Sequence, residues 1–278
     1  MKELELLKSY DFKFNKKFGQ NFIFDSNLLN AIVADAGVDK NTTVVEIGTG
    51  AGTLTRAIAN KAKRVISFEI DTELKPFLDN IFQSYDNIEV RFQDIMKVDL
   101  KSFENELNEK YVLIANLPYY ITTPIIFKFL EEAEYLTAMY IMVQLEVAER
   151  LTAKAGTSEY GAITPAIDVI GDARISRKVS RNMFTPKPNV DSAIVEIKLN
   201  KNKFEILDLP LLKKVISASF QMRRKTLTNN LKSAFGNNVE YWAEILESLG
   251  FERTVRGETL SANDFVKLAN KIYELKNN

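Results

Sequence analysis

Apolar and polar positions along most of the chain follow the pattern of strands separated by helices. Residues 43–47 are mainly β-branched and lead into glycines, which is typical of a buried strand followed by a tight turn. Further apolar runs predict strands at residues 64–69, 88–92, 111–115 and 138–143. Helical patterns lie between most of them, at residues 26–36 with Ser26 as N-cap, 54–59, 72–83, 124–133 and 146–153. This alternation predicts an α/β domain with a mostly parallel sheet, covered on both faces.

The pattern changes towards the C-terminus. Residues 173–179 and 192–199 predict two late strands, which we expect to form an antiparallel pair that closes the sheet. After about residue 200 only helical patterns remain, at residues 209–220, 225–235, 240–249 and 261–275. We therefore expect an α/β domain over residues 1–200 and a small all-α domain over residues 201–278.

The 278 residues include no cysteine and no histidine. This composition excludes a disulfide framework, a cysteine nucleophile, a histidine base and the usual zinc and iron ligands. Catalysis must rely on carboxylates, amides, lysine, tyrosine, hydroxyls or positioning alone, and we expect no metal. No apolar run approaches the roughly 18 residues that a membrane span needs, and the first residues do not resemble a secretory signal. We expect a cytoplasmic protein without a membrane partner.

The formal net charge of zero conceals an uneven distribution. Residues 69–159 carry 17 acidic and 8 basic side chains, whereas residues 174–232 carry 14 basic and 4 acidic ones. A basic stretch of this kind suits a polyanion such as RNA. Two unrelated solvated faces are the alternative.

A glycine-rich turn follows the first predicted strand, where residues 48–52 read Gly-Thr-Gly-Ala-Gly. Glycines allow positive φ and let the backbone approach a ligand closely, and ligands of open parallel sheets bind beyond the carboxyl ends of the strands. The dinucleotide fingerprint has its third glycine one residue later, where this chain has Thr53. This spacing, with Glu46 in the strand to disfavour a pyrophosphate, favours S-adenosylmethionine over NAD. A tight strand-to-helix turn without a ligand is the alternative.

Two acidic residues follow the next predicted strands. Glu69 ends one strand and can accept hydrogen bonds from both ribose hydroxyls, as in dinucleotide-binding folds. Asp94 follows the next strand and can accept a hydrogen bond from the adenine amine of the cofactor. Either acid alone is more often a surface carboxylate, but the glycine turn and both acids in this order are more specific for a cofactor site.

The run Asn116-Leu117-Pro118-Tyr119 ends an apolar strand at the same edge of the predicted sheet. The amine of an adenine is a poor nucleophile because its lone pair is delocalised into the ring. The Asn116 side-chain oxygen and the Leu117 carbonyl could accept its hydrogens and favour a pyramidal nitrogen. Pro118 stiffens the turn, and Tyr119 offers a face for stacking the base. Alignment and charge placement then suffice for methyl transfer, since no strong base is needed. An Asn-Leu-Pro turn of purely structural importance is the alternative.

Several longer motifs occur in a fixed order along the chain. They are residues 17–22 (KFGQNF), 48–55 (GTGAGTLT), 116–124 (NLPYYITTP), 144–150 (QLEVAER), 184–192 (FTPKPNVDS) and 220–227 (FQMRRKTL). From about residue 12 to the C-terminus, the sequence resembles the ribosomal RNA adenine N6,N6-dimethyltransferases. It departs from the usual pattern at Ile23, Thr49, Tyr120 and Thr122, where leucine, proline, asparagine and serine are common.

The resemblance implies a Rossmann-like class I methyltransferase domain and a small helical domain that contacts rRNA. It implies dimethylation of two adjacent adenosines near the 3′ end of small-subunit (16S) rRNA during ribosome biogenesis. Phe184 would cover the target base opposite Tyr119, and Arg223, Arg224 and Lys225 would grip rRNA phosphates. The alternatives are a loop aromatic that fills the core and a charged helix start. The positions expected to contact the cofactor are Asn21, Ile23, Gly48, Gly50, Glu69, Asp94 and Asn116.

Other functions stay open on the sequence alone. Within the family, the antibiotic-resistance branch methylates an adenine of large-subunit (23S) rRNA, and mitochondrial relatives double as transcription factors. Outside it, the same fold serves small-molecule or protein methyltransferases, and a non-catalytic RNA-binding or assembly protein could keep it. The basic segment at Arg223 and the helical tail favour the small-subunit branch, with rRNA in a pre-30S particle as partner. We expect a monomer because no coiled coil is apparent.

Overall fold

The computed structural model describes residues 5–6, 9–10, 21–118 and 121–277. The chain divides into two compact units, which are described separately. The first comprises Met1–Ala148 and Arg174–Lys198, and the second comprises Glu149–Ala173 and Leu199–Asn278. The sequence placed a single boundary near residue 200. The chain does pass into the helical unit there, but the segment Glu149–Ala173 also belongs to that unit.

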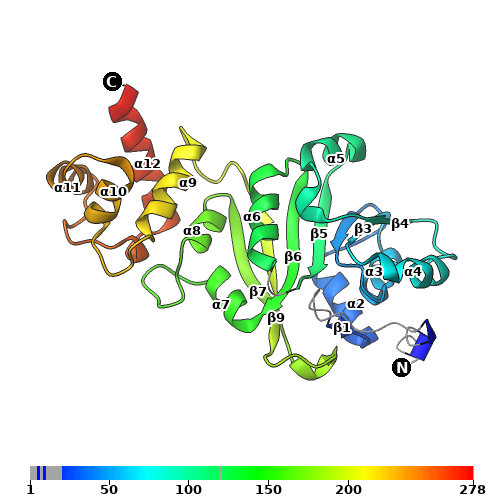
Figure 1. Ribbon diagram of the computed structural model, residues 1–278. Helices are drawn as coiled ribbons and strands as arrows, with labels where there is room; N and C mark the ends of the chain where they lie inside the picture. Colours follow the sequence, from blue (N-terminus) through cyan, green and yellow to red (C-terminus); the bar gives the residue numbers. More distant parts are fainter. Residues whose placement is uncertain (1–4, 7–8, 11–20, 119–120, 278) are drawn as a thin grey trace. The chain divides into compact units, whose positions relative to one another are not determined.

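A seven-stranded sheet forms the centre of the fold (Figure 1). Its order is β4 (Ile88–Phe92), β3 (Arg64–Glu69), β2 (Thr43–Ile47), β5 (Tyr111–Asn116), β6 (Leu136–Gln144), β9 (Ser192–Leu199) and β7 (Gly171–Val179). The first five strands pair in parallel, and β9 pairs antiparallel to β6. The predicted mostly parallel sheet is therefore confirmed.

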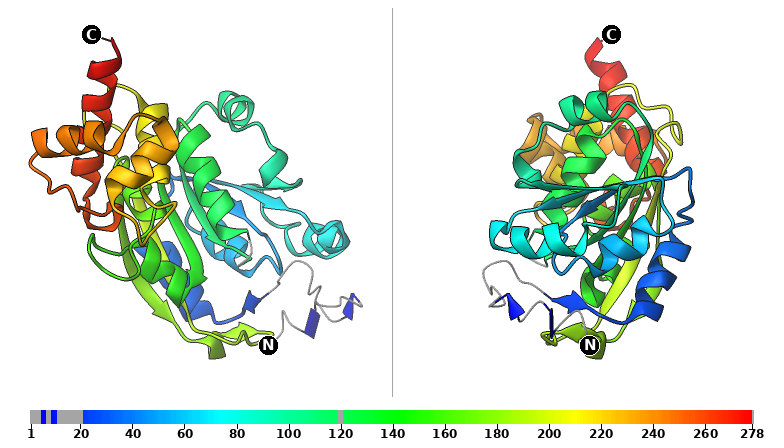
Figure 2. Two further views of the ribbon diagram at one scale, coloured as in Figure 1. Left: turned by 60° about the vertical axis from the view of Figure 1, so that its left-hand side comes forward. Right: turned by 90° about the vertical axis from the view of Figure 1, so that its right-hand side faces the viewer.

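Helices cover both faces of this sheet (Figures 1 and 2). On one face, Leu29 and Ile58 from two helices join Val44, Val65 and Ile114 of the strands in a buried core. On the other face, aromatic side chains of a helix and of β3 and β5 meet edge to face. The helices of this unit are α2 (Ser26–Asp35), α3 (Thr53–Ala59), η2 (Thr72–Leu74), α4 (Lys75–Ile81), η3 (Ile95–Lys97), α5 (Leu100–Leu107), α6 (Thr122–Glu132) and the start of α7 (Leu145–Leu151).

The structure differs from the sequence prediction in several details, two of which concern α2 and α5. The N-cap of α2 is Asp25, whose carboxylate accepts a hydrogen bond from the Leu28 N–H at 2.8 Å, so the prediction of Ser26 was wrong. The helix α5 was not predicted, although Asp99 caps it by accepting from the Ser102 N–H at 3.1 Å.

A second, two-stranded sheet joins distant parts of the first unit. It pairs β1 (Phe22–Ile23) with β8 (Phe184–Thr185) in antiparallel register, so that Ile23 lies opposite Phe184. The short helix η4 (Arg181–Met183) leads into β8. This pair brings the segment around residue 22 next to residues far along the chain.

The second unit is helical, as predicted for the C-terminal region. Its helices are α8 (Ile163–Asp168), α9 (Leu209–Ser219), α10 (Leu227–Phe235), α11 (Val239–Ser248), η5 (Gly257–Thr259) and α12 (Ala262–Asn277). The helix α9 packs against α12 and α10, and α10 packs against α11 (Figure 2). Leu212, Leu227, Trp242, Leu246 and Phe265 fill the core between them.

No helix in the described part of the chain is both long enough and apolar enough to cross a membrane. Within the same residues, no group of three or more carboxylate side chains has an arrangement that could hold a metal ion.

Candidate active site

A cleft of about 1060 Å³, its open mouth included, lies at the carboxyl ends of β2, β3 and β5. In the sheet, β3 is the neighbour of β2 on one side and β5 is its neighbour on the other. The order of the strands therefore reverses at β2, and ligands of open α/β sheets bind at such a switch point. All the predicted cofactor contacts line this cleft: Asn21, Ile23, Gly48, Gly50, Glu69, Asp94 and Asn116. Leu117 lines it as well. The fold thus gathers residues from five separate segments.

The glycine turn has the backbone conformation that its sequence predicts. Gly48, Gly50 and Gly52 have φ values of 84°, 53° and 68°, in the region that favours glycine. A Cβ atom on Gly50 would lie 2.8 Å from the Phe22 ring, and one on Gly52 would lie 2.7 Å from Ile81 and Phe82. The glycines are required both for the turn and for the close packing of aromatic side chains against it.

Glu69 fixes the glycine turn to the end of β3. Its Oε2 accepts a hydrogen bond from the Gly50 N–H at 2.8 Å, and its Oε1 accepts from the N–H groups of Ile70 (2.8 Å) and Asp71 (2.9 Å). Burial raises the pKa of Glu69, and these backbone donors oppose that effect. The carboxylate therefore shapes the cleft, in addition to the predicted contact with a ribose.

Glu46 does not face the cleft, so the sequence argument that its charge disfavours a pyrophosphate was wrong. Its side chain is fully buried, and Oε2 accepts hydrogen bonds from Thr55 (2.6 Å) and Ser67 (2.7 Å). Burial raises the pKa of Glu46 to about 8, which leaves the carboxyl neutral at pH 7. Since Oε2 accepts twice, the proton belongs on Oε1, which has no hydrogen-bond partner among the described residues. The Ser67 hydroxyl also forms a hydrogen bond with the Thr49 hydroxyl, so Glu46 is connected to the glycine turn through Ser67.

The charge of the cleft is negative. Asp94 lines it, and one of its oxygens caps η3 by accepting from the Met96 N–H at 3.0 Å. Among the described residues that line the cleft, two are carboxylates and none is a lysine or arginine.

Ile70, which was not predicted from the sequence, also lines the cleft and is 45% exposed. It could have been predicted from its position, because an apolar residue that directly follows the acid at the end of a strand lies at the edge of the sheet where ligands bind.

The side chain of Asn116 is held in one orientation. Its Nδ2 donates a hydrogen bond to the backbone carbonyl of Asn21 at 2.9 Å. A carbonyl oxygen can only accept, so the amide nitrogen must face Asn21 and Oδ1 must face away from it. The next residue, Leu117, is buried, which restricts the turn that carries its carbonyl. The Asn116 oxygen is thus oriented by a hydrogen bond, and the second predicted acceptor, the Leu117 carbonyl, follows it directly in the chain.

The strand β1 is itself attached to the glycine-rich segment. The hydroxyl of Thr53 donates to the backbone carbonyl of Ile23 at 2.7 Å, and the Phe22 ring packs against Gly50. The carbonyl groups of Asn21 and Ile23 therefore hold two different sides of the cleft. Both positions were predicted as cofactor contacts.

The two predicted stacking aromatics differ in what the structure shows. Tyr119 lies outside the described residues, as does Tyr120. Phe184 is 4% exposed and belongs to the core cluster that contains Ile23, Val179 and Ile194. It does not line the cleft in this structure. Its role in covering a base stays a prediction.

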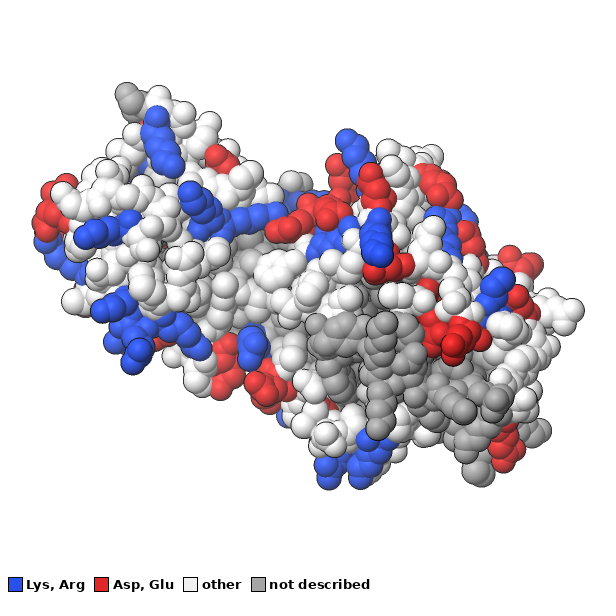
Figure 3. All heavy atoms as spheres, in the orientation of Figure 1, with Lys and Arg blue, Asp and Glu red and all other residues white. Residues whose placement is uncertain are grey.

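The predicted RNA-binding residues lie in the second unit, in the turn between α9 and α10. Arg223, Arg224 and Lys225 are all exposed. Figure 3 shows lysine and arginine side chains gathered along the lower margin of this unit. The unit as a whole carries 15 basic and 13 acidic residues, so it is nearly neutral. Any affinity for RNA must therefore come from where the charges lie.

The sequence of the chain is similar to those of known proteins over almost its whole length. Residues 11–273 match the family described as ribosomal RNA adenine dimethylase. The ribosomal RNA small subunit methyltransferase A of Clostridioides difficile is 42% identical over 271 residues, which cover 96% of this chain and 94% of that protein. The protein of the same name from Enterococcus faecalis is 42% identical over 281 residues, covering 98% and 95%.

Solved structures show the same fold. A dimethyladenosine transferase from Plasmodium falciparum has a TM-score of 0.76 and 27% identity, covering 91% of this chain and 98% of its own. The 23S rRNA methyltransferase ErmE has a TM-score of 0.71 over 91% of this chain and all of its own, but only 23% identity, so it supports the fold alone. With its family match and its relatives, the chain belongs to the ribosomal RNA adenine dimethylase family.

Proposed function

We propose that this protein dimethylates the N6 amines of two adjacent adenosines near the 3′ end of small-subunit rRNA, with S-adenosylmethionine as the methyl donor. The observation that carries the proposal is the fixed amide of Asn116, whose oxygen is turned away from Asn21 at the edge of a cleft with a glycine turn. The names of the relatives support the small-subunit substrate.

The cleft fits S-adenosylmethionine better than a dinucleotide. Glu69 and Asp94 supply negative charge, and no basic side chain among the described lining residues could neutralise a pyrophosphate. Glu69 and Asp94 would hold the ribose and adenine, and the backbone of Gly48 and Gly50 would lie against the amino-acid moiety. When bound, the cofactor supplies an electrophilic methyl group on a sulfonium.

The residues at the end of β5 position the adenine amine. The Asn116 Oδ1 and the Leu117 carbonyl accept its two hydrogens, which draws electron density onto the nitrogen and favours a pyramidal geometry. Because the Asn21 carbonyl already fixes the amide, the acceptor is in place before the base arrives. The proton released from the amine passes to water, so the absence of histidine is no obstacle.

The test is methylation of small ribosomal subunits that lack adenine dimethylation, with purified protein and labelled cofactor. We expect two methyl groups on each of two adjacent adenosines, located by mass mapping of the rRNA. Asn116→Ala should reduce the rate at least about 100-fold, since it removes one acceptor for the amine together with the hydrogen bond to Asn21 and one of the predicted cofactor contacts.

The control variant is Lys101→Ala, which changes an exposed residue of α5 and should retain full activity. Label on large-subunit rRNA alone would refute the proposed substrate. Full activity of Asn116→Ala would refute the proposed mechanism.

A further inference from the structure

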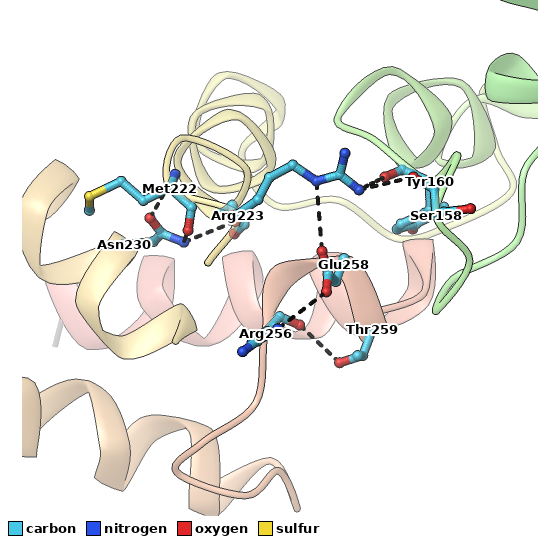
Figure 4. Close-up of polar contacts among 9 residues, drawn as sticks. Ser158, Tyr160, Met222, Arg223, Asn230, Arg256, Glu258 and Thr259 are labelled. Atoms are coloured by element: carbon cyan, nitrogen blue, oxygen red, sulfur yellow. Dashed lines mark hydrogen bonds and ion pairs between the residues drawn. The ribbon is translucent and has the colours of Figure 1, made fainter. Parts of the chain in front are cut away.

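One buried amide holds the turn that carries the basic residues of the second unit (Figure 4). Asn230 of α10 is fully buried. Its Nδ2 donates to the carbonyls of Ser219 (3.1 Å) and Met222 (3.4 Å), and its Oδ1 accepts from the Met222 N–H at 3.2 Å. The backbone of the turn between the end of α9 and Arg223 is therefore fixed.

The guanidinium of Arg223 is also held. Its Nη2 donates to the backbone carbonyls of Ser158 (3.0 Å) and Tyr160 (3.3 Å), as Figure 4 shows. The loop that supplies these carbonyls is tied to η5, since the Gly156 N–H donates to the Glu258 carbonyl at 2.8 Å. Arg223 thus presents its charge from a defined position, although its side chain is half-exposed.

The carboxylate of Glu258 lies between two arginines. Its Oε2 is 3.7 Å from the Arg223 Nε, and its Oε1 is 3.8 Å from the Arg256 Nη1. Both distances exceed a hydrogen bond, and both arginine side chains are 53% exposed, so these ion pairs hold Glu258 only loosely. A carboxylate that directs one oxygen towards each guanidinium presents its two acceptors in the same way as two free oxygens of a phosphate.

We propose that Glu258 competes with a phosphate of the rRNA backbone for Arg223 and Arg256, and that RNA binding displaces its side chain from between them. The inference rests on the proposed function, because it takes rRNA as the partner. In a unit with nearly equal numbers of acidic and basic residues, one carboxylate at this place weakens the binding of any RNA.

If Glu258 instead assisted RNA binding, its removal would change the affinity for RNA in the opposite direction. If Glu258 aligned the two arginines for RNA, its removal would weaken binding. If it competes with phosphate, its removal strengthens binding.

The test is Glu258→Gln, which keeps the size of the side chain and removes its charge. We expect its affinity for small ribosomal subunits that lack adenine dimethylation to rise about threefold to tenfold. The slope of log K against log salt should also steepen, by up to about 0.9 for the phosphate gained. Glu252→Gln is the matched control, since it removes an exposed carboxylate of the same unit and should change the affinity less. In an Arg256→Ala background, Glu258→Gln should lose part of its gain.

Glu258→Asp is the second variant, because it withdraws the carboxylate without changing the charge and should give a smaller gain of the same sign. Thermal unfolding checks that each variant is folded. An affinity equal to or below that of Glu252→Gln overturns the competition. If the wild type methylates these subunits normally in that case, only this inference fails; if it neither binds nor methylates them, the proposed function fails too.

Discussion

The cleft of the first unit and the basic turn of the second unit are built from different kinds of contact. In the cleft, main-chain groups give the shape: glycines with positive φ, and three backbone N–H groups that donate to Glu69. In the basic turn, the charges are on exposed side chains, and the ion pairs of Glu258 span 3.7 and 3.8 Å. The function of the cleft should therefore depend mainly on its shape, and that of the turn mainly on its charge. Substitutions in the two regions should differ in size and in their response to salt and pH.

The largest effect is expected for Gly50→Ala. A Cβ at this position meets the Phe22 ring at 2.8 Å, and φ is 53°, so the variant combines steric overlap with backbone strain. Cofactor binding, measured by calorimetry, should weaken at least about 100-fold, because the turn and β1 must both shift.

Gly37→Ala separates the two causes. Gly37 also has a positive φ, of 63°, but a Cβ there meets nothing within 4 Å. This control should lower stability by about 1–3 kcal/mol and leave the cofactor affinity of the folded protein unchanged. If the two variants bound cofactor equally well, the cleft would not depend on geometry in the way described.

A smaller effect is expected from Arg224→Ala combined with Lys225→Ala. RNA affinity should fall about tenfold at physiological salt, and the slope of log K against log salt should flatten by about 1.8 if each side chain neutralises one phosphate. Cofactor affinity should not change. The comparison is with Lys101→Ala plus Lys110→Ala, which removes two exposed lysines of the first unit. Equal slopes for the two double variants would remove the basic turn from the RNA interface.

The last effect concerns Glu46, which links the stability of the protein to pH. Burial raises the pKa of Glu46 to about 8 in the folded protein, so the folded state keeps a proton that the unfolded state has lost above about pH 4.5. This residue's contribution to stability is present below that pH and is lost as pH rises to about 8. Urea unfolding at several pH values should show a flatter pH dependence for Glu46→Gln than for the wild type. Parallel curves would show that Glu46 is ionised in the folded protein.

Local patterns in the sequence predicted much of the fold. The strand Thr43–Ile47 and the glycine turn could be predicted because β-branched residues and glycines each favour a particular conformation of their own backbone. The N-cap of α2 was misplaced by one residue, since Asp25 and Ser26 are both good caps and only the geometry chooses between them. The buried residues Leu100, Phe103 and Leu107 had helical spacing, so α5 could have been predicted.

Contacts between residues far apart in the chain could not be predicted from the sequence. The bond from Asn116 to the Asn21 carbonyl spans 95 positions, and no local pattern announces it. The same holds for Arg223, which the sequence assigned to RNA alone and which the structure also ties to Ser158, 65 positions away. In both cases a side chain chosen for its chemistry is oriented by a backbone carbonyl.

The bond between Asn21 and Asn116 has a consequence for small-molecule inhibitors. Because the amide nitrogen donates to Asn21, the oxygen of Asn116 faces away from that residue as an acceptor, and the lining carboxylates also accept hydrogen bonds. A tight inhibitor should therefore carry a positive charge and place an amine or amide N–H near Asn116. A compound that offers a carbonyl at the same place would meet an unmatched acceptor and bind weakly.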